Sequence, residues 1–220
     1  MKTILKTRIL YTVFSFFLFS GIVGFFSPLA VTGVESLSLL EKEVIQEINR
    51  SRTNPKGCAS ILDQWKSYFD GTLLKFPGEI PIKTIEGWNA VDEAIRFLRT
   101  IHPMPPLTLS KGMSLGARDH VKDLISSGRM GHKGSDGSQP WDRVSRYGSW
   151  KKPIGENISF GLNKAQPIVM GLIIDDGVSG RGHRKNIFNP LFHVIGVACE
   201  EQAHYKTVCV ITFAGSYIEK

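Results

Sequence analysis

The sequence has few cysteines, no concentrated basic region and no hydrolase signature, and each of these gaps excludes a class of protein. Only three cysteines occur among the 220 residues, without a CxxC pair or a Cys/His spacing that would predict a zinc finger. The 27 lysines and arginines exceed the 20 acids by seven, but they are scattered, which argues against a nucleic-acid partner. The chain contains no HExxH motif and no Ser-His-Asp or Cys-His nucleophile pattern, so no short motif marks a hydrolase.

The first 33 residues have the composition of a secretory signal. Residues 1–33 contain three bases and no acid, and the stretch 9–31 is almost wholly apolar. A cationic start followed by an apolar run is typical of an export signal, and we expect cleavage before Val34. The run is also long enough for one membrane span, so an uncleaved anchor is the alternative. We expect a secreted, extracellular protein that meets a membrane only through this segment.

The mature residues 34–220 are predicted to form one domain, because their number suffices for one core and is small for two. Ser38 and Glu41 have the form of a capping box, and apolar residues follow at helical spacing. The segments 65–83 and 131–153 show no clear period and are interpreted as loops, the first with room for one short helix. Helices are expected over 38–53, 85–100, 110–128 and 165–176.

The C-terminal residues predict a β-hairpin whose register follows from side-chain alternation. A disulfide between Cys199 and Cys209 is expected, because facing positions lie within disulfide reach and an exported protein meets an oxidant. The alternative is that both are reduced core thiols, and Cys58 is expected to be a buried, unpaired thiol. One register satisfies three facing pairs: Ile195 with Phe213, Val197 with Ile211, and Cys199 with Cys209.

Two histidines and three acids in or beside glycine-rich segments are the candidate site residues. They are His132, Glu156, Asp175, Asp176 and His183. Neutral imidazoles are good zinc ligands and carboxylates orient them, so these residues could form a metal site. The long interval between the two histidines does not by itself support a metal site. From composition alone, scattered surface histidines are the better interpretation.

Three motifs in this order alter that interpretation: Gly131-His132-Lys133, Gly155-Glu156-Asn157-Ile158 and Gly182-His183-Arg184-Lys185-Asn186-Ile187. Their wording and order resemble the CAP superfamily of cysteine-rich secretory, antigen-5 and pathogenesis-related proteins. The likeness extends over about 40–217 and is closest to bacterial members. It implies an α+β fold, an α-β-α sandwich with a central antiparallel sheet between helical layers, and a single SCP domain over 34–220.

The resemblance also implies a cleft in which two histidines bind a divalent metal, with Zn²⁺ expected, beside two acids. His132 and His183 match the histidine positions, and Glu156 matches the first acid. Asp175 matches the second acid, with Asp176 as the alternative. The implied function is binding of an extracellular ligand of lipid, sterol or protein class. The rival interpretation is a zinc-dependent hydrolase or protease with Glu156 as general base.

The residues around these motifs have plainer interpretations. Asn157 and Asn186 are expected to hydrogen-bond loop backbone. Arg184 and Lys185 are expected to be solvated. His120, on the helix expected over 110–128, is expected to lie on an exposed face.

Overall fold

The structure is a computed structural model that describes residues 36–202 and 206–220. Leu37–Lys220 form one compact unit. The expected signal, residues 1–33, and the expected cleavage site lie outside the described residues, so export stays a prediction. Within the described part of the chain, no helix combines the length and the apolarity that crossing a membrane would need.

The first helix, α1 (Leu39–Thr53), begins at the predicted capping box. Ser38 N donates to Glu41 Oε2 at 2.7 Å, and Glu41 N donates to Ser38 Oγ at 3.2 Å. The expected end near Thr53 is confirmed, but a second helix, α2 (Pro55–Gln64), follows directly and was not predicted. Pro55 occupies its first turn, where a missing N–H costs no hydrogen bond. The proline therefore marks the start of a new helix.

A small antiparallel sheet with the strand order β1-β2-β3 occupies most of the segment expected to be a loop. Its strands are two residues long, too short to show a period in the sequence. The helix α3 (Trp88–Thr100) follows; it begins three residues after the expected residue 85, ends as expected, and buries one apolar face. The elements between α2 and α3 are the 3₁₀ helix η1 (Trp65–Tyr68), β1 (Phe69–Asp70), β2 (Leu73–Leu74) and β3 (Ile82–Lys83).

The helix α4 (Lys111–Ser127) has the predicted ends, with Ser110 as N-cap and Gly128 as a left-handed C-cap. The helix α6 (Ala165–Ile174) ends slightly before the expected residue 176. The expectation of a loop over 131–153 is wrong in its second half. That stretch contains α5 (Pro140–Ser145) and the beginning of strand β5 (Gly148–Phe160), and a short helix α7 (Gly182–Ile187) was also not predicted.

The main sheet has four strands in the order β4-β6-β7-β5. Strands β6 (Val194–Gln202) and β7 (Lys206–Glu219) form the predicted hairpin, and the three predicted facing pairs are confirmed. The Cys199–Cys209 disulfide is present, and Cys58 is a buried free thiol. The sheet is not wholly antiparallel, because the short strand β4 (Thr108–Leu109) pairs parallel to β6 at one edge.

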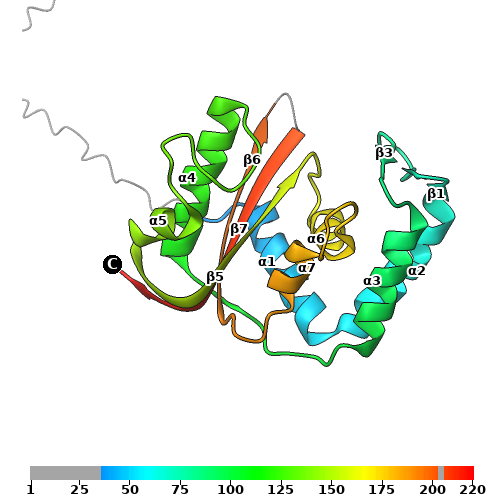
Figure 1. Ribbon diagram of the computed structural model, residues 1–220, viewed down its shortest axis with the longest axis horizontal. Coiled ribbons are helices and arrows are strands. Elements are labelled where there is room, and N and C mark those ends of the chain that lie inside the picture. Colours follow the sequence, from blue (N-terminus) through cyan, green and yellow to red (C-terminus); the bar gives the residue numbers. More distant parts are fainter. Residues whose placement is uncertain (1–35, 203–205) are drawn as a thin grey trace, which may run out of the picture. The chain divides into compact units, whose positions relative to one another are not determined.

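The sheet lies between two helical layers, as Figure 1 shows, with α4 and α5 on one side and α1, α6 and α7 on the other. Alternate side chains of the hairpin point to opposite faces. Val197 and Ile211 belong to the core that includes residues of α1 and α6. Ala198 and Val210 belong to a second core with residues of α4. This arrangement confirms the predicted α-β-α sandwich.

Candidate functional site

Glu156 on β5 is buried and is bound by two basic side chains. It is 5% exposed. Its Oε1 atom lies 3.0 Å from His132 Nδ1, and its Oε2 atom accepts a hydrogen bond of 2.8 Å from Arg143 Nη2. Both carboxylate oxygens therefore have a partner, and the buried charge is balanced by the Arg143 guanidinium. The His132 side chain above it is 49% exposed.

The loop between α4 and α5 that carries His132 is held by hydrogen bonds at several points. Arg143 donates to His132 O at 3.1 Å and to Ser138 O at 3.0 Å. On the other side, Asp123 near the end of α4 accepts a hydrogen bond of 3.0 Å from Ser135 N. The backbone on both sides of His132 is thus fixed, which positions its imidazole over Glu156.

Sequence reasoning missed Arg143, because its helix α5 was interpreted as loop. A local signal for that helix was available. Pro140 stands in the first turn of α5, and Asp142 Oδ2 accepts a hydrogen bond of 2.9 Å from Gln139 N, as at many helix starts. The buried position of Arg143 follows only once this helix is placed.

His120 is buried, so the expectation that it is exposed is wrong. Its Nε2 atom lies 2.9 Å from Gly131 O and 3.8 Å from Glu156 Oε1. Its Nδ1 atom has no hydrogen-bond partner among the described residues. Burial lowers the pKa of His120, and the Glu156 charge opposes this only in part. The neutral ring, with Nε2 donating to Gly131 O, fits this environment and holds the residue before His132.

His183 and Asp175 form the second histidine–acid pair. Asp175 Oδ1 lies 2.6 Å from His183 Nδ1, and Asp175 Oδ2 accepts a hydrogen bond of 2.8 Å from His183 N. Asp175 is 3% exposed and caps α6 in a left-handed conformation with φ of 57°. This turn of the backbone points the short aspartate side chain at α7. The His183 side chain is 24% exposed.

Asp176, the alternative acid, lies elsewhere. Its carboxylate accepts hydrogen bonds from Ile85 N at 2.6 Å and Glu86 N at 2.8 Å. It therefore holds the segment that leads into α3 and, in the described part of the chain, forms no hydrogen bond or ion pair with His183. Of the two neighbouring aspartates, the structure places Asp175 beside the histidine.

Arg184 is buried, so the expectation that it is solvated is wrong, whereas Lys185 is exposed as expected. Arg184 Nη2 donates to Ile174 O at 3.0 Å, and its Nη1 lies 2.6 Å from Glu93 Oε1 on α3. The bond to Arg184 is the largest cause that lowers the pKa of Glu93. Arg184 thus ties the end of α6 to α3, next to the Asp175–His183 pair.

Two asparagines connect the two pairs through β5, and both bind backbone, but of the helix α7 and the strand β5 instead of the expected loops. Asn157 Nδ2 donates to His183 O at 3.0 Å. Asn186 Nδ2 donates to Glu156 O at 3.2 Å and to Asn157 Oδ1 at 2.8 Å. Consecutive residues of one strand therefore support His132 through the Glu156 carboxylate and the His183 backbone through the Asn157 amide.

The two histidine–acid pairs have the same arrangement of carboxylate and imidazole. In each, the carboxylate binds Nδ1 of the imidazole, which leaves Nε2 as the outer nitrogen that could ligate a metal. The carboxylates are already engaged, so each pair offers a metal one imidazole donor, and the two pairs together offer two. That is fewer than the three protein ligands of a typical catalytic zinc site. Within the described ranges, no group of three or more His, Cys, Asp or Glu side chains is placed to hold a metal ion.

Comparison with known proteins assigns this chain to a family. A model of the cysteine-rich secretory protein family, abbreviated CAP, matches residues 93–213. This stretch is more than half of the chain and includes both histidine–acid pairs. The chain belongs to the cysteine-rich secretory protein family, which confirms the resemblance first seen in the three motifs.

The individual relatives share limited sequence identity with this chain. The uncharacterized protein YkwD of Bacillus subtilis (strain 168) is 31% identical over 98 residues, which are 44% of this chain and 36% of that protein. The match thus spans about a third of the relative's length. Among solved structures, an extracellular SCP-domain protein from Bacillus anthracis str. Ames is 23% identical with a TM-score of 0.41, covering 55% of this chain and 37% of its own. A cysteine-rich secretory protein from Staphylococcus aureus subsp. aureus Mu50 is 13% identical with a TM-score of 0.40, covering 71% and 48%.

Proposed function

We propose that this chain is an exported binding module whose His132 and His183 bind a divalent metal ion, Zn²⁺ in the first place. The observation that carries the proposal is the repeated pairing of an imidazole Nδ1 with a buried carboxylate, at 3.0 Å for His132 and 2.6 Å for His183. A carboxylate on one nitrogen fixes the tautomer and the ring orientation and makes the other nitrogen a better ligand.

The contacts of Glu156 favour binding over hydrolysis. A general base must accept a proton from a water molecule within hydrogen-bond reach. Glu156 is almost fully buried, and its two oxygens already contact His132 and Arg143. A hydrolase that used Glu156 would first have to break one of these contacts.

Export and an extracellular ligand belong to the same proposal. The cationic start and the apolar run of residues 1–33 support export, and the disulfide supports an oxidising compartment. The solved SCP-domain protein of Bacillus anthracis is itself extracellular. The ligand at the histidines would be a lipid, a sterol or a protein, and the bound metal would contribute a positive charge to its recognition.

The test is isothermal titration of the full chain with ZnCl₂ at pH 7.5. His132→Ala and His183→Ala should each weaken binding about tenfold or more, because each removes one of two imidazole donors. Binding should also weaken at pH 5.5, since an imidazole ligates only in its neutral form. His102→Ala is the matched control, because His102 is exposed and, among the described residues, forms no hydrogen bond or ion pair with either histidine–acid pair.

Circular dichroism should show that each variant keeps its fold. Unchanged Zn²⁺ affinity in both His132→Ala and His183→Ala would show that the histidines only hold the structure together. Chelator-sensitive hydrolysis of a peptide or ester that Glu156→Gln abolishes would establish the hydrolase instead.

A further inference from the structure

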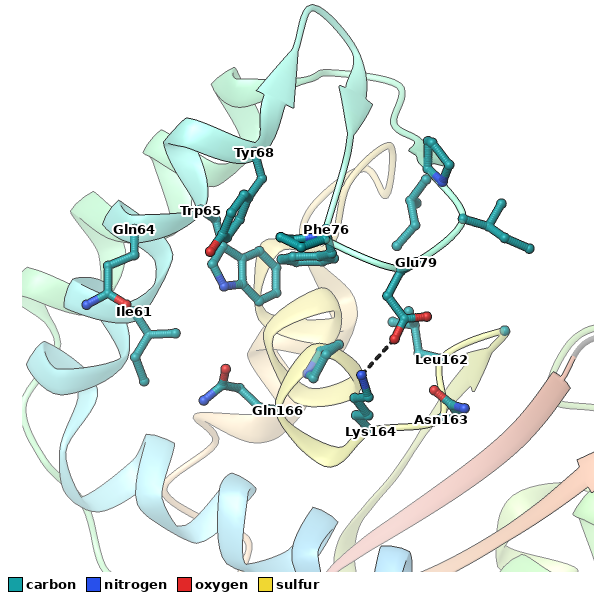
Figure 2. Close-up of a pocket in the computed structure, with 16 residues that line it drawn as sticks. Ile61, Gln64, Trp65, Tyr68, Phe76, Glu79, Leu162, Asn163, Lys164 and Gln166 are labelled. Carbon is teal, nitrogen blue, oxygen red and sulfur yellow. Dashed lines mark hydrogen bonds and ion pairs between the residues drawn. The ribbon is translucent and has the colours of Figure 1, made fainter.

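A second candidate site is a pocket of about 880 Å³ between the small three-stranded sheet and the beginning of α6. Figure 2 shows Trp65, Tyr68 and Phe76 grouped on one wall of it. Neither histidine–acid pair contributes to its lining. The part of the wall that comes from residues 61–82 precedes the stretch 93–213 that matches the family model. This part of the wall therefore lies outside the stretch that defines the family, whereas the wall from residues 161–167 lies inside it.

An inner chamber of about 130 Å³ adjoins this pocket. Trp65, Phe76, Leu162 and Pro167 line both spaces. The rings of Trp65 and Phe76 meet edge to face with centroids 4.8 Å apart, which fixes this shared wall. A small, largely apolar chamber beside a larger pocket suits a single large aliphatic or aromatic group.

Three amide side chains at the pocket are available to a ligand. Gln64, Asn163 and Gln166 are exposed and line the pocket. Their side chains make no hydrogen bond within the part of the chain that the structure describes. An amide group has both donors and an acceptor. This set matches a peptide backbone, in which N–H and C=O groups also alternate.

The charges of the pocket argue against a charged ligand. Its charged lining residues are Glu79 and Lys164, and they pair with each other at 2.7 Å, as Figure 2 shows. The inner chamber adds Lys83 and Asp176, one residue of each sign. The lining of the two spaces together therefore carries no excess positive charge for a fatty-acid carboxylate, a phosphate or a polyanion. An uncharged glycan would satisfy the amides but has no large apolar group for the inner chamber.

We propose that this pocket binds an extended peptide segment of another protein. One large apolar side chain of that segment enters the inner chamber, and the three amides hydrogen-bond its backbone. Recognition of an extended backbone by polar groups, with a side-chain pocket for specificity, is a common mode of peptide binding. A central apolar anchor supplies most of the affinity in such complexes.

Gly171 on α6 provides the sharpest test, because it lines the inner chamber. A Cβ atom at this position would lie 3.5 Å from Leu162 Cδ1, an ordinary contact, so Gly171→Ala should fold normally. Gly171→Leu should fill the chamber. A phage-displayed library of random decapeptides is panned against the full chain, and recovered sequences are measured as synthetic, N-acetylated and C-amidated peptides by fluorescence anisotropy.

Recovered peptides should share one Leu, Ile, Met or Phe, and its replacement by Ala should weaken binding tenfold or more. Gly171→Leu should weaken the same peptides to a similar degree, and Gly171→Ala should do so less. Gln166→Ala should cost about three- to tenfold by removing a surface hydrogen bond. Gln46→Ala is the matched control, because Gln46 is an exposed glutamine on α1 outside the pocket. Without added metal, peptide affinity should not change in His132→Ala, which separates this proposal from the metal site.

Three results would overturn the proposal. In the first, no sequence is enriched on the wild-type chain over Gly171→Leu. In the second, the peptides bind Gly171→Leu and Gln166→Ala as tightly as the wild type. In the third, palmitate or a neutral oligosaccharide saturates the pocket while no peptide competes. Circular dichroism of every variant tests whether it is folded, and Gln166→Ala, a surface change, keeps the test decisive if Gly171→Leu does not fold.

Discussion

Replacing Arg143 by methionine should destabilise the protein strongly. Among the described residues, Arg143 is the only fully buried basic side chain that forms a hydrogen-bonded ion pair with Glu156. Arg143 is 2% exposed and donates to Ser138 O, His132 O and Glu156 Oε2. The change removes these bonds and leaves the Glu156 carboxylate buried without its cation. Breaking a buried pair on one side costs about 3–5 kcal/mol.

Urea titration and thermal unfolding measure this loss. For a domain of this size the expected fall in Tm is about 6–20 °C. Arg96→Met is the control, because Arg96 forms an exposed pair with Asp92, with side chains 64% and 45% exposed, and should cost less than about 1 kcal/mol. Adding Glu156→Gln to Arg143→Met should restore part of the stability by removing the unpaired charge. A loss no larger than the control's, or a double variant less stable than Arg143→Met, would refute the reasoning.

Three further predictions concern protonation, the disulfide and export. Because burial lowers the pKa of His120, the unfolded chain binds a proton first as the pH falls, so stability should decrease below about pH 6.5. Urea titrations at pH 7.5 and 5.5 measure this loss of stability, which should be smaller in His120→Gln than in the wild type. An equal loss in the two proteins would contradict the prediction. Non-reducing peptide mapping should find Cys199 linked to Cys209 and Cys58 free. Reduction should cost about 2–3 kcal/mol, and a link to Cys58 would contradict the register. Protein from the culture medium should begin at Val34, whereas recovery only of the full-length chain in membranes would favour the anchor.

The elements that the sequence predicted correctly have local signals. The capping box of Ser38 and Glu41, and the caps Ser110 and Gly128, each lie within a few residues of the helix end that they define. The register of the hairpin follows from alternation in two strands that are close in sequence. Strand β5 lacks such a signal. It pairs at the sheet edge with a strand some fifty residues later, and its burial pattern does not alternate.

The sequence singled out the four residues of the two histidine–acid pairs, including the buried Glu156 and Asp175, but it missed the buried residues around them. Pattern and resemblance pointed to His132 and His183, whereas Arg143, Arg184 and His120 were overlooked or expected at the surface. A basic residue is exposed by default, because burying it requires a partner. For Arg184 that partner is Glu93, which is 91 residues away in the sequence. No local pattern in the sequence encodes such a pairing.

The helix α6 contributes to both candidate sites. Gln166 and Pro167 in its first turn line the peptide pocket, and Asp175 at its C-terminal end holds His183. Ten residues of helix make a stiff rod about 15 Å long. A shift of α6 along its axis would therefore move both ends together. If a bound peptide causes such a shift, the peptide changes the metal affinity by some factor. The bound metal must then change the peptide affinity by the same factor.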